Sequence, residues 1–410
     1  MENINKFNLN LEFDLAKNKS NVIKVIGVGG GGGNAVNYMY QKGIKDVDFV
    51  IVNTDSQDLS KSPVPVKIQI GKTLTEGLGA GANPEIGLKA IMEDKDRVIE
   101  TLNGADMVFV TCGMGGGTGT GAAPVIAEIA KDLGALTVGI TTMPFSWEGM
   151  VRKRNAEKGI EAMRERVDTI LVIPNDRIFS IIEPNTSFIS AFKEVDSVLL
   201  EATRSISDLI NVHGYINLDF ADIRTIMAGM GDALMGSGVG VGENRAIVAA
   251  EQAITSPLLD GVDIAGARGV LINITGGPNI SMHEVGQASS LIQQTVGEEA
   301  NVIFGVVIDD NLSEEIRVTV IATGFNKDFE KAEILQKPKE EEAPKKETAK
   351  DRDSTDYREY DKPTFIRQRK SVEEPFARKP QPQIYFFNED EVENDPENLE
   401  IPAFLRKQMD

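Results

Sequence analysis

The feature that most constrains this chain is a pair of glycine-rich runs, each placed between a short β-type stretch and a helix-type stretch. The first run, Gly27–Gly33, follows Val22–Ile26, and the second, Gly115–Gly121, follows Met107–Thr111 and leads into Ala122–Leu133. Glycine lets a backbone approach a ligand closely, because no Cβ atom stands in the way. Amides at the N-terminus of a helix favour anions. The sequence therefore predicts two phosphate-binding loops in one domain.

The first run, taken alone, has a second interpretation. Gly27, Gly29 and Gly32 match the G-x-G-x-x-G pattern of dinucleotide-binding folds, and Asp55 stands where a ribose-binding acid is expected. This pattern favours a nicotinamide-dependent oxidoreductase. A dinucleotide needs only one tight turn for its pyrophosphate, so the second glycine run favours a ligand with a longer phosphate chain.

A P-loop is excluded. The only Gly-Lys-Thr of the chain begins at Gly71, and Val66 stands where that motif requires its first glycine. Without a P-loop lysine, we expect backbone amides, helix dipoles and a cation to hold the phosphates.

β-type and helix-type stretches alternate from residue 22 to about residue 139, which is typical of βαβ units around a parallel sheet. We expect helices at Ser190–Leu209, Ile223–Leu234 and Arg245–Ile254. The expected strands are Val22–Ile26, Val47–Val52, Val66–Ile70, Met107–Thr111, Leu136–Ile140, Ile170–Ile173, Gly269–Ile274, Val302–Val307 and Arg317–Thr323. We predict an α/β fold, in which a Rossmann-like domain with a parallel sheet is joined by a long central helix to a smaller α+β C-terminal domain.

The domain boundaries follow from these patterns and from composition. We expect a flexible segment at residues 1–20, a phosphate-binding domain at 21–189, the central helix at 190–213 and the C-terminal domain at 214–325. Residues 326–395 are rich in Lys, Glu, Pro and Gln, which predicts a disordered linker. Apolar residues return at residues 396–410, as in a docking peptide on a tether.

The charge and composition of the chain limit the classes of partner that it can bind. A net charge of −20 argues against nucleic acid as a ligand and against direct attachment to an anionic membrane. The first 20 residues hold no signal-peptide core and no apolar stretch is long enough to span a bilayer, so we expect a cytoplasmic protein without direct membrane insertion. Because Cys112 is the single cysteine, the chain cannot form an internal disulfide. The sequence has no Cys/His cluster with metal-ligand spacing, so we do not expect a structural metal site built by protein side chains.

The chain resembles the FtsZ family of tubulin-like GTPases. The residues that carry the resemblance are Gly27–Asn34, Asn53–Asp55, Gly77–Pro84, Gly113–Pro124, Asn217–Asp222 and Ile401–Gln408. It covers residues 21–325 nearly continuously, plus the last dozen residues. The resemblance implies the tubulin/FtsZ fold and a GTP/GDP site with Mg²⁺ accompanying the nucleotide. This chain departs from the family in having Trp147 where phenylalanine is usual, and Met150 and Val151 where basic residues are frequent.

The resemblance also implies a nucleotide site. Backbone amides of the two glycine loops would hold the phosphates, and a third loop would close over the γ-phosphate. Glu148 and Arg152 would line the ribose and phosphate side, although a surface ion pair is the plainer interpretation. Phe192 would stack on the purine, Asp196 would accept from guanine N1–H and N2–H₂, and Asn175 would contact the sugar or base. The loop residues are Gly30, Gly31, Gly32, Gly33, Asn34, Ala80, Gly81, Ala82, Asn83, Gly115, Gly116, Gly117, Thr118 and Gly119.

The hydrolytic groups are expected elsewhere in the chain. Asp219 and Asp222, with Asn217, form an acidic segment between the two predicted domains. Carboxylates at i and i+3 can orient a water and help to hold a cation, but Asp219 is an equally good candidate for the N-cap of a following helix. In the family this segment enters the nucleotide pocket of the next subunit.

The resemblance finally implies the biological setting. Head-to-tail homopolymers would form the bacterial division (Z) ring at mid-cell, and Ile401–Gln408 would bind membrane tethers such as FtsA and other division proteins. A nucleotide-binding filament scaffold that never hydrolyses GTP is the other alternative that the residues leave open, beside the oxidoreductase.

Overall fold

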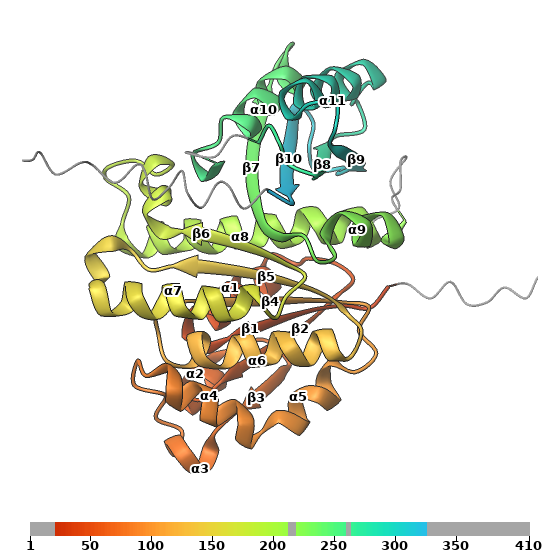
Figure 1. Cartoon of the computed structure of the whole chain (residues 1–410). Coiled ribbons are helices and arrows are strands. Elements are labelled where there is room, and N and C mark those ends of the chain that lie inside the picture. Colours follow the sequence, from red (N-terminus) through yellow and green to blue (C-terminus); the bar gives the residue numbers. More distant parts are fainter. Residues whose placement is uncertain (1–20, 212–218, 260–263, 326–410) are drawn as a thin grey trace, which may run out of the picture. The chain divides into compact units, whose positions relative to one another are not determined.

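The structure, a computed structural model, describes residues 21–211, 219–259 and 264–325, which all belong to one compact unit of the chain (Figure 1). The strands are β1 (Ile23–Val28), β2 (Val47–Asn53), β3 (Val66–Gln69), β4 (Met107–Gly113), β5 (Leu136–Met143), β6 (Thr169–Pro174), β7 (Gly231–Val241), β8 (Gly269–Gly276), β9 (Asn301–Ile308) and β10 (Glu315–Thr323). The α-helices are α1 (Gly29–Gln41), α2 (Ser56–Lys61), α3 (Lys72–Thr75), α4 (Pro84–Glu93), α5 (Lys95–Leu102), α6 (Thr118–Asp132), α7 (Met150–Arg164), α8 (Phe188–Asn211), α9 (Phe220–Met227), α10 (Arg245–Ile254) and α11 (Met282–Val296). Short 3-10 helices are η1 (Ser146–Glu148), η2 (Asn175–Ser180) and η3 (Pro257–Leu259).

One ten-stranded sheet runs through the described residues in the order β3-β2-β1-β4-β5-β6-β7-β10-β8-β9. The pairs from β3 to β7 are parallel, β10 is antiparallel to both β7 and β8, and β9 is parallel to β8. The expected parallel α/β sheet is confirmed. Because parallel strands place their carboxyl ends at the same edge, the loops after β1, β2, β4 and β5 meet there, where such sheets bind ligands.

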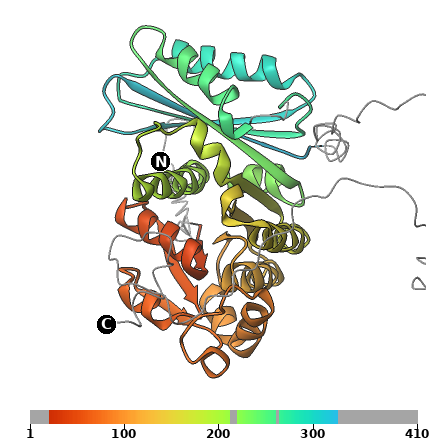
Figure 2. The ribbon, with the colours of Figure 1, turned by 90° about the vertical axis from the view of Figure 1, so that its left-hand side faces the viewer.

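The strands of the first half are apolar on both faces, which is typical of a parallel sheet covered by helices on both sides. In β4, Phe109 faces the core under α1 and α8, whereas Val108 and Val110 face the core under α4, α5, α6 and α7. Figure 2 shows helices on both sides of these strands, with α11 (teal) on the outer face of the C-terminal strands. The sheet of the first half is thus the middle layer of three.

Helix α8 connects the two halves of the chain. One of its sides packs against α1 and β5, and another packs against β8 and β9 (Figure 1). Leu199 and Ile206 belong to a core that also includes Leu271 of β8. The buried Asn273 side chain donates to the Ser205 carbonyl at 3.1 Å, which fixes β8 against the helix.

The expected helix Ile223–Leu234 is wrong in its second half. Helix α9 ends at Met227, and β7 starts at Gly231, after two glycines with φ of +67° and +73° at Gly229 and Gly231 have turned the chain. In β7, alternate glycines face α10: an ideal Cβ would lie 2.0 Å from the Ala253 oxygen at Gly236, 2.2 Å from the Ala249 oxygen at Gly238 and 1.9 Å from the Arg245 oxygen at Gly240. The strand therefore has glycine on the face that α10 covers.

The other expected strands, the long helix and the helix Arg245–Ile254 are confirmed to within a few residues. Helix α11 was not expected. It begins with a capping box, in which the Ser281 hydroxyl accepts from the Glu284 amide at 3.2 Å and the Glu284 carboxylate accepts from the Ser281 amide at 2.8 Å. Of the helices that the structure describes, none is long and apolar enough to cross a membrane.

Candidate nucleotide site

Both glycine runs contain the first turn of a helix. Helix α1 begins at Gly29 and α6 at Thr118, so α6 starts four residues before the expected Ala122. Neither N-cap residue, Val28 or Gly117, makes a side-chain cap, and neither first turn holds an acidic residue. The first amides of both helices therefore keep their capacity to bind an anion.

These two helix starts open into a cavity of about 420 Å³ at the carboxyl edge of the parallel strands. The cavity brings together most of the residues that the sequence predicts for a nucleotide. The predicted residues that line it are Gly30, Gly31, Asn34, Ala80, Gly81, Ala82, Gly116, Gly117, Thr118, Gly119, Glu148, Arg152, Asn175, Phe192 and Asp196.

The loop at residues 80–83 lies directly against the second glycine run. An ideal Cβ at Gly117 would be 2.8 Å from the Ala80 Cβ and 2.9 Å from the Asn83 nitrogen. Any side chain at this position would push the two loops apart. Glycine is thus needed here for the close approach of two backbone segments that share the cavity wall.

Buried hydroxyls hold the loops in place. The Thr54 and Thr118 hydroxyls are 2.7 Å apart and buried, which connects the end of β2 to the start of α6. The Gly115 amide donates to the Thr120 hydroxyl at 2.9 Å. The loop after β4 is therefore bonded back onto the first turn of α6 before any ligand arrives.

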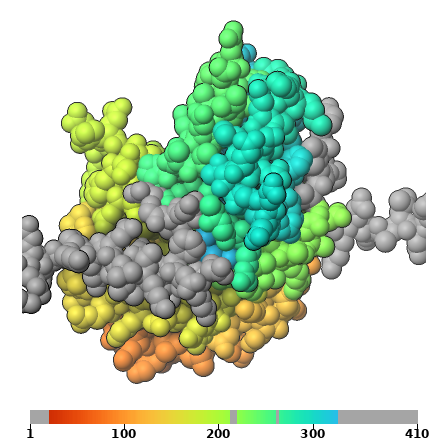
Figure 3. All heavy atoms as spheres, turned by 45° about the horizontal axis from the view of Figure 1, so that its top comes forward, coloured from red at the N-terminus to blue at the C-terminus, as the bar shows by residue number. Residues whose placement is uncertain are grey.

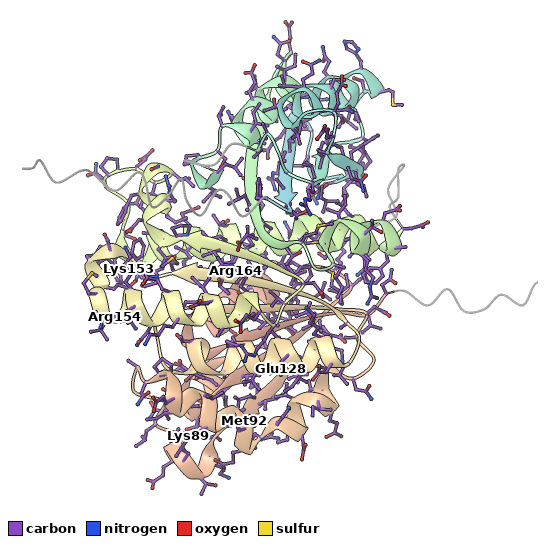
Figure 4. All side chains as sticks on the ribbon, in the orientation of Figure 1. Lys89, Met92, Glu128, Lys153, Arg154 and Arg164 are labelled. Carbon is purple, nitrogen blue, oxygen red and sulfur yellow. The ribbon has the colours of Figure 1, made fainter. Side chains whose placement is uncertain are left out.

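Glu148 and Arg152 form an ion pair at the start of α7. Glu148 also accepts from the Phe145 amide at 2.8 Å, so its carboxylate is fixed from two sides. The Arg152 side chain is about half exposed, at 49%, and Arg152 lines the cavity. Both interpretations of these two residues therefore hold, because they form an ion pair and also line the cavity. Figure 4 shows the neighbouring basic residues Lys153 and Arg154 on the same end of α7.

One face of α8 forms the far wall. Phe192, Val195, Asp196 and Leu199 follow each other at helical spacing and all line the cavity. Burial raises the pKa of the Asp196 carboxyl to about 7, because its charged form is taken out of water. This wall offers an aromatic ring, two aliphatic side chains and one titratable acceptor.

Asn175 is 6% exposed, and its Oδ1 has no hydrogen-bond partner among the described residues, although the side chain lines the cavity. A buried polar oxygen without a partner costs free energy. A ligand group that donates a hydrogen bond would satisfy it.

Four of the residues predicted to bind the nucleotide do not line the cavity. Gly32 and Gly33 are buried in α1, where Gly32 lets the helix approach β4, since an ideal Cβ would lie 2.3 Å from the Thr111 oxygen. Asn83 is the N-cap of α4, and its side chain accepts from the Glu85 amide at 3.0 Å. The amide of Gly115 is already bonded to Thr120. These residues shape the loops rather than the cavity surface.

The acidic segment lies away from the cavity. Asp219 and Asp222 are both exposed, and neither lines the cavity. Asp219 occupies the N-cap position of α9, but its side chain makes no cap hydrogen bond, so both carboxylates stay available. Asn217 and the peptide Ile401–Gln408 lie outside the described residues.

A contact with the chain just before β5 shows where α9 lies relative to the cavity. Arg224 of α9 donates to the Gly134 carbonyl, which lies just before β5 begins, whereas Thr142 and Pro144 at the end of β5 line the cavity. A strand of 8 residues is about 26 Å long. Within one molecule, α9 and the cavity are therefore at opposite edges of the sheet.

Sequence reasoning missed several lining residues. Val195 and Leu199 could have been found by extending the helical spacing of Phe192 and Asp196, and Thr142 and Pro144 by extending β5 to the edge where its neighbours end. The other missed lining residues are Val28, Gly29, Gly113 and Met114. Cys112 lies beneath the loop, and burial raises the pKa of its thiol to about 12, so it behaves as an inert apolar side chain.

Two family models match the chain. Residues 22–183 match the GTPase domain of the Tubulin/FtsZ family, and residues 231–326 match the C-terminal domain of the FtsZ family. Among solved structures, an FtsZ dimer of M. jannaschii is 43% identical, with a TM-score of 0.72, over 75% of this chain and 89% of that chain.

Two structures from Haloferax volcanii share the fold at 24% identity. They are a GDP-bound monomer of CetZ1, with a TM-score of 0.66 over 77% of this chain and 99% of that chain, and a GTPγS-bound protofilament of CetZ2, with a TM-score of 0.64 over 76% and 98%. The 43% identity to the FtsZ structure, the share of both chains that it covers and the two matched domains show the family. The cavity lies within the residues that match the GTPase domain and the helix that follows them. This chain is a GTPase, and it belongs to the FtsZ family.

Proposed function

We propose that this chain is a cytoskeletal GTPase that assembles head to tail into filaments, and that its active site is completed by the acidic segment of the adjacent subunit. Self-association is supported by the M. jannaschii relative, which is described as a dimer, and by the CetZ2 structure, which is described as a protofilament. The proposal gives the nucleotide a position between two subunits.

The observation that carries this proposal is the separation of the two halves of the site. The cavity has amides for phosphate, but the only carboxylates that line it among the described residues are Glu148, which is paired with Arg152, and Asp196 on the wall formed by α8. Asp219 and Asp222 are exposed and lie at the other edge of the sheet, and the Asp219 side chain makes no cap hydrogen bond to α9. A second molecule that brings its α9 to the cavity would supply the missing water-orienting carboxylates.

Within the cavity, the first amides of α1 and α6 would hold the phosphates and residues 80–82 would cover the γ-phosphate. Mg²⁺ fits this arrangement as an ion carried mainly by phosphate oxygens and water, because the phosphate end offers amides and Thr118 rather than a carboxylate cage. Among the described residues, no three His, Cys, Asp or Glu side chains gather into a metal site.

At the other end of the cavity, Phe192 would stack on the base and Asn175 would accept a hydrogen bond with its unsatisfied Oδ1. Ionised Asp196 would accept from both N1–H and N2–H₂ of guanine. Adenine lacks this donor pair, so the carboxylate would select GTP over ATP.

The test is complementation between two defective variants of the full-length protein. Asp222→Ala keeps its cavity and should bind GTP but lose turnover. Gly117→Val should lose GTP binding, because its side chain would overlap the loop at residues 80–83, yet it keeps Asp222. Phosphate release should partly return when the two variants are mixed. Wild-type turnover by Asp222→Ala alone, or no recovery in mixtures that do co-sediment, would contradict the role of the acidic segment.

Two alternatives are separated by the same measurements. A filament scaffold that does not hydrolyse GTP would give GTP-dependent light scattering without phosphate release. An oxidoreductase is not supported, because the chain has the GTPase domain and because Asp55, the candidate ribose-binding acid, is used as the N-cap of α2, accepting from the Gln57 amide at 2.8 Å.

The cellular part of the proposal rests on family membership. The filaments would form the division ring in the cytoplasm at mid-cell, and Ile401–Gln408 would bind FtsA or another membrane tether. A fluorescent fusion should form a mid-cell band, and deletion of residues 396–410 should abolish co-sedimentation with FtsA while GTP-dependent assembly of the purified protein persists.

A further inference from the structure

Helix α9, which carries Asp222, is bonded to the rest of the molecule at its C-terminal end. The last four carbonyls of a helix have no partner within the helix, and in α9 two of the last carbonyls accept from buried side chains. The Thr323 hydroxyl donates to the Ile226 carbonyl at 2.9 Å. The Thr169 hydroxyl donates to the Met227 carbonyl. Both threonines are fully buried, so these two bonds are made away from solvent.

The two hydroxyls come from different parts of the sheet. Thr169 is the first residue of β6, Thr323 is the last residue of β10, and β7 lies between these strands. Gly269 of β8 leaves room for the contact, since an ideal Cβ there would lie 2.9 Å from both the Thr323 Oγ1 and the Ile226 Cγ2. In Figure 3 the light-green surface that includes α9 lies between the teal C-terminal part and the orange N-terminal part. The end of α9 is thus held from both halves of the chain.

The N-terminal end of α9 has fewer attachments. The Asp219 side chain makes no cap hydrogen bond. The tertiary hydrogen bonds that the described residues make with α9 all lie beyond Asp222, at Arg224, Ile226 and Met227. The direction of α9 and its rotation about its own axis are therefore set from its C-terminal end.

A small rotation of α9 would displace its carboxylate. The tip of a helical side chain lies about 5 Å from the helix axis, so a rotation of about 10° moves the Asp222 carboxylate by about 1 Å. Misplacement of a reacting group by about 1 Å can slow a reaction about 100-fold. Loss of either hydroxyl would leave a buried carbonyl without a partner, and α9 could regain one only by moving.

We propose that Thr169 and Thr323 are positioning residues for GTP hydrolysis: by holding the C-terminal end of α9, they direct the Asp222 carboxylate toward the γ-phosphate of the adjacent subunit. This inference rests on the proposed function, in which the α9 of one copy completes the active site of the next. Neither threonine lines the nucleotide cavity. Their loss should therefore slow hydrolysis without weakening GTP binding or assembly.

Thr169→Val and Thr323→Val replace the hydroxyl with a methyl group of similar size. With full-length protein, Mg²⁺ and saturating GTP above the assembly threshold, phosphate release per assembled subunit should fall at least about tenfold in each variant. The KM for GTP and the amount of protein that co-sediments should stay at the wild-type level. Thr169→Ser and Thr323→Ser keep the donor and should restore most of the turnover.

Thr203→Val is the matched control. Thr203 is also fully buried, and its hydroxyl donates to a backbone carbonyl at 2.9 Å, but this carbonyl belongs to Leu199 of α8. The variant loses a comparable hydrogen bond that does not involve α9. Its turnover should stay at the wild-type level.

Mixed assemblies show to which subunit the defect belongs. In the pair of Asp222→Ala and Gly117→Val, the first variant contributes the intact cavity and the second contributes the intact α9. Thr323→Val added to the Gly117→Val subunit should lower the recovered phosphate release about tenfold. Thr323→Val added to the Asp222→Ala subunit should leave the recovery unchanged, because the α9 of that subunit already lacks its carboxylate.

The outcomes distinguish this inference from the proposed function. Wild-type turnover by Asp222→Ala alone contradicts the proposed function. If the original pair recovers turnover but Thr323→Val has the same effect on either subunit, or if Thr323→Val and Thr203→Val turn over alike, the threonines do not position α9. Should the valine variants fail to fold, Thr323→Cys supplies a weaker donor: turnover below that of Thr323→Ser would support the proposal, and equal turnover would overturn it.

Discussion

Asp196 is the residue whose function should depend most directly on pH. Its pKa of about 7 in the free protein means that it is half protonated near neutrality, and only the ionised carboxylate accepts from both donors of guanine. GTP binding should therefore expel a proton below pH 7, and affinity should fall about tenfold for each further pH unit. Fluorescent-GTP titrations between pH 6 and 8.5 measure this slope.

The variant Asp196→Asn removes the titrating group and one acceptor oxygen. We expect GTP affinity about 10- to 100-fold lower at pH 8, with no remaining pH slope and weaker discrimination against ATP. Asp132→Asn, an exposed position on α6, should keep the wild-type profile. A pH slope that persists in Asp196→Asn would mean that another group binds the base.

Among the secondary-structure elements, β7 packs closely against α10 only because glycines form its packing face. Gly238→Ala would place a methyl group 2.2 Å from the Ala249 oxygen, so α10 would have to move off the strand. Overpacking of this kind costs about 1–3 kcal/mol of the free energy of unfolding. Urea unfolding followed by circular dichroism measures the loss.

Gly286→Ala is the matched control for that variant. Gly286 is inside α11, and an ideal Cβ there meets nothing within 4 Å. Alanine should stabilise the helix by roughly 0.5–1 kcal/mol relative to glycine. Equal unfolding midpoints for Gly238→Ala and the wild type would show that α10 does not pack on β7 as closely as the structure has it.

The contrast between β4 and β7 shows what the sequence can and cannot predict. β4 is predictable because both its faces are buried, so its residues form an apolar run bounded by the glycine loop. The sequence pattern predicts a helix end at the start of β7, because the packing face of this strand consists of glycines, which carry no hydrophobic signal. The alternation Gly236, Gly238, Gly240 is the pattern that could have revealed it.

The nucleotide site also contains both features that the sequence predicts and features that it does not. The glycine runs predicted the phosphate loops, because close backbone approach requires glycine whatever the rest of the fold does. The resemblance to the family predicted Phe192 and Asp196. The separate functions of Gly115 and Asn83, one bonded to Thr120 and the other capping α4, depend on tertiary contacts that sequence spacing does not contain.

Across the whole described part of the chain, α8 connects two sites that no single molecule brings together. Its first turns supply Phe192 and Asp196 to the cavity, and its last residue, Asn211, precedes the acidic segment. A helix of 24 residues is about 36 Å long. A molecule built in this way has a nucleotide at one edge and carboxylates at the other, so its turnover should depend on contact between molecules.

The last prediction is therefore that GTP turnover per molecule depends on protein concentration. At saturating GTP and Mg²⁺, phosphate release per molecule should be close to zero in dilute solution, should rise once assembly begins, and should approach a constant value well above the threshold. Each cavity is then matched with the α9 of a neighbour. Asp222→Ala, at the same concentrations, should bind GTP and stay flat. A wild-type turnover that is the same from nanomolar to micromolar protein would mean that one molecule contains the complete active site, and the acidic segment would then have to act within its own chain.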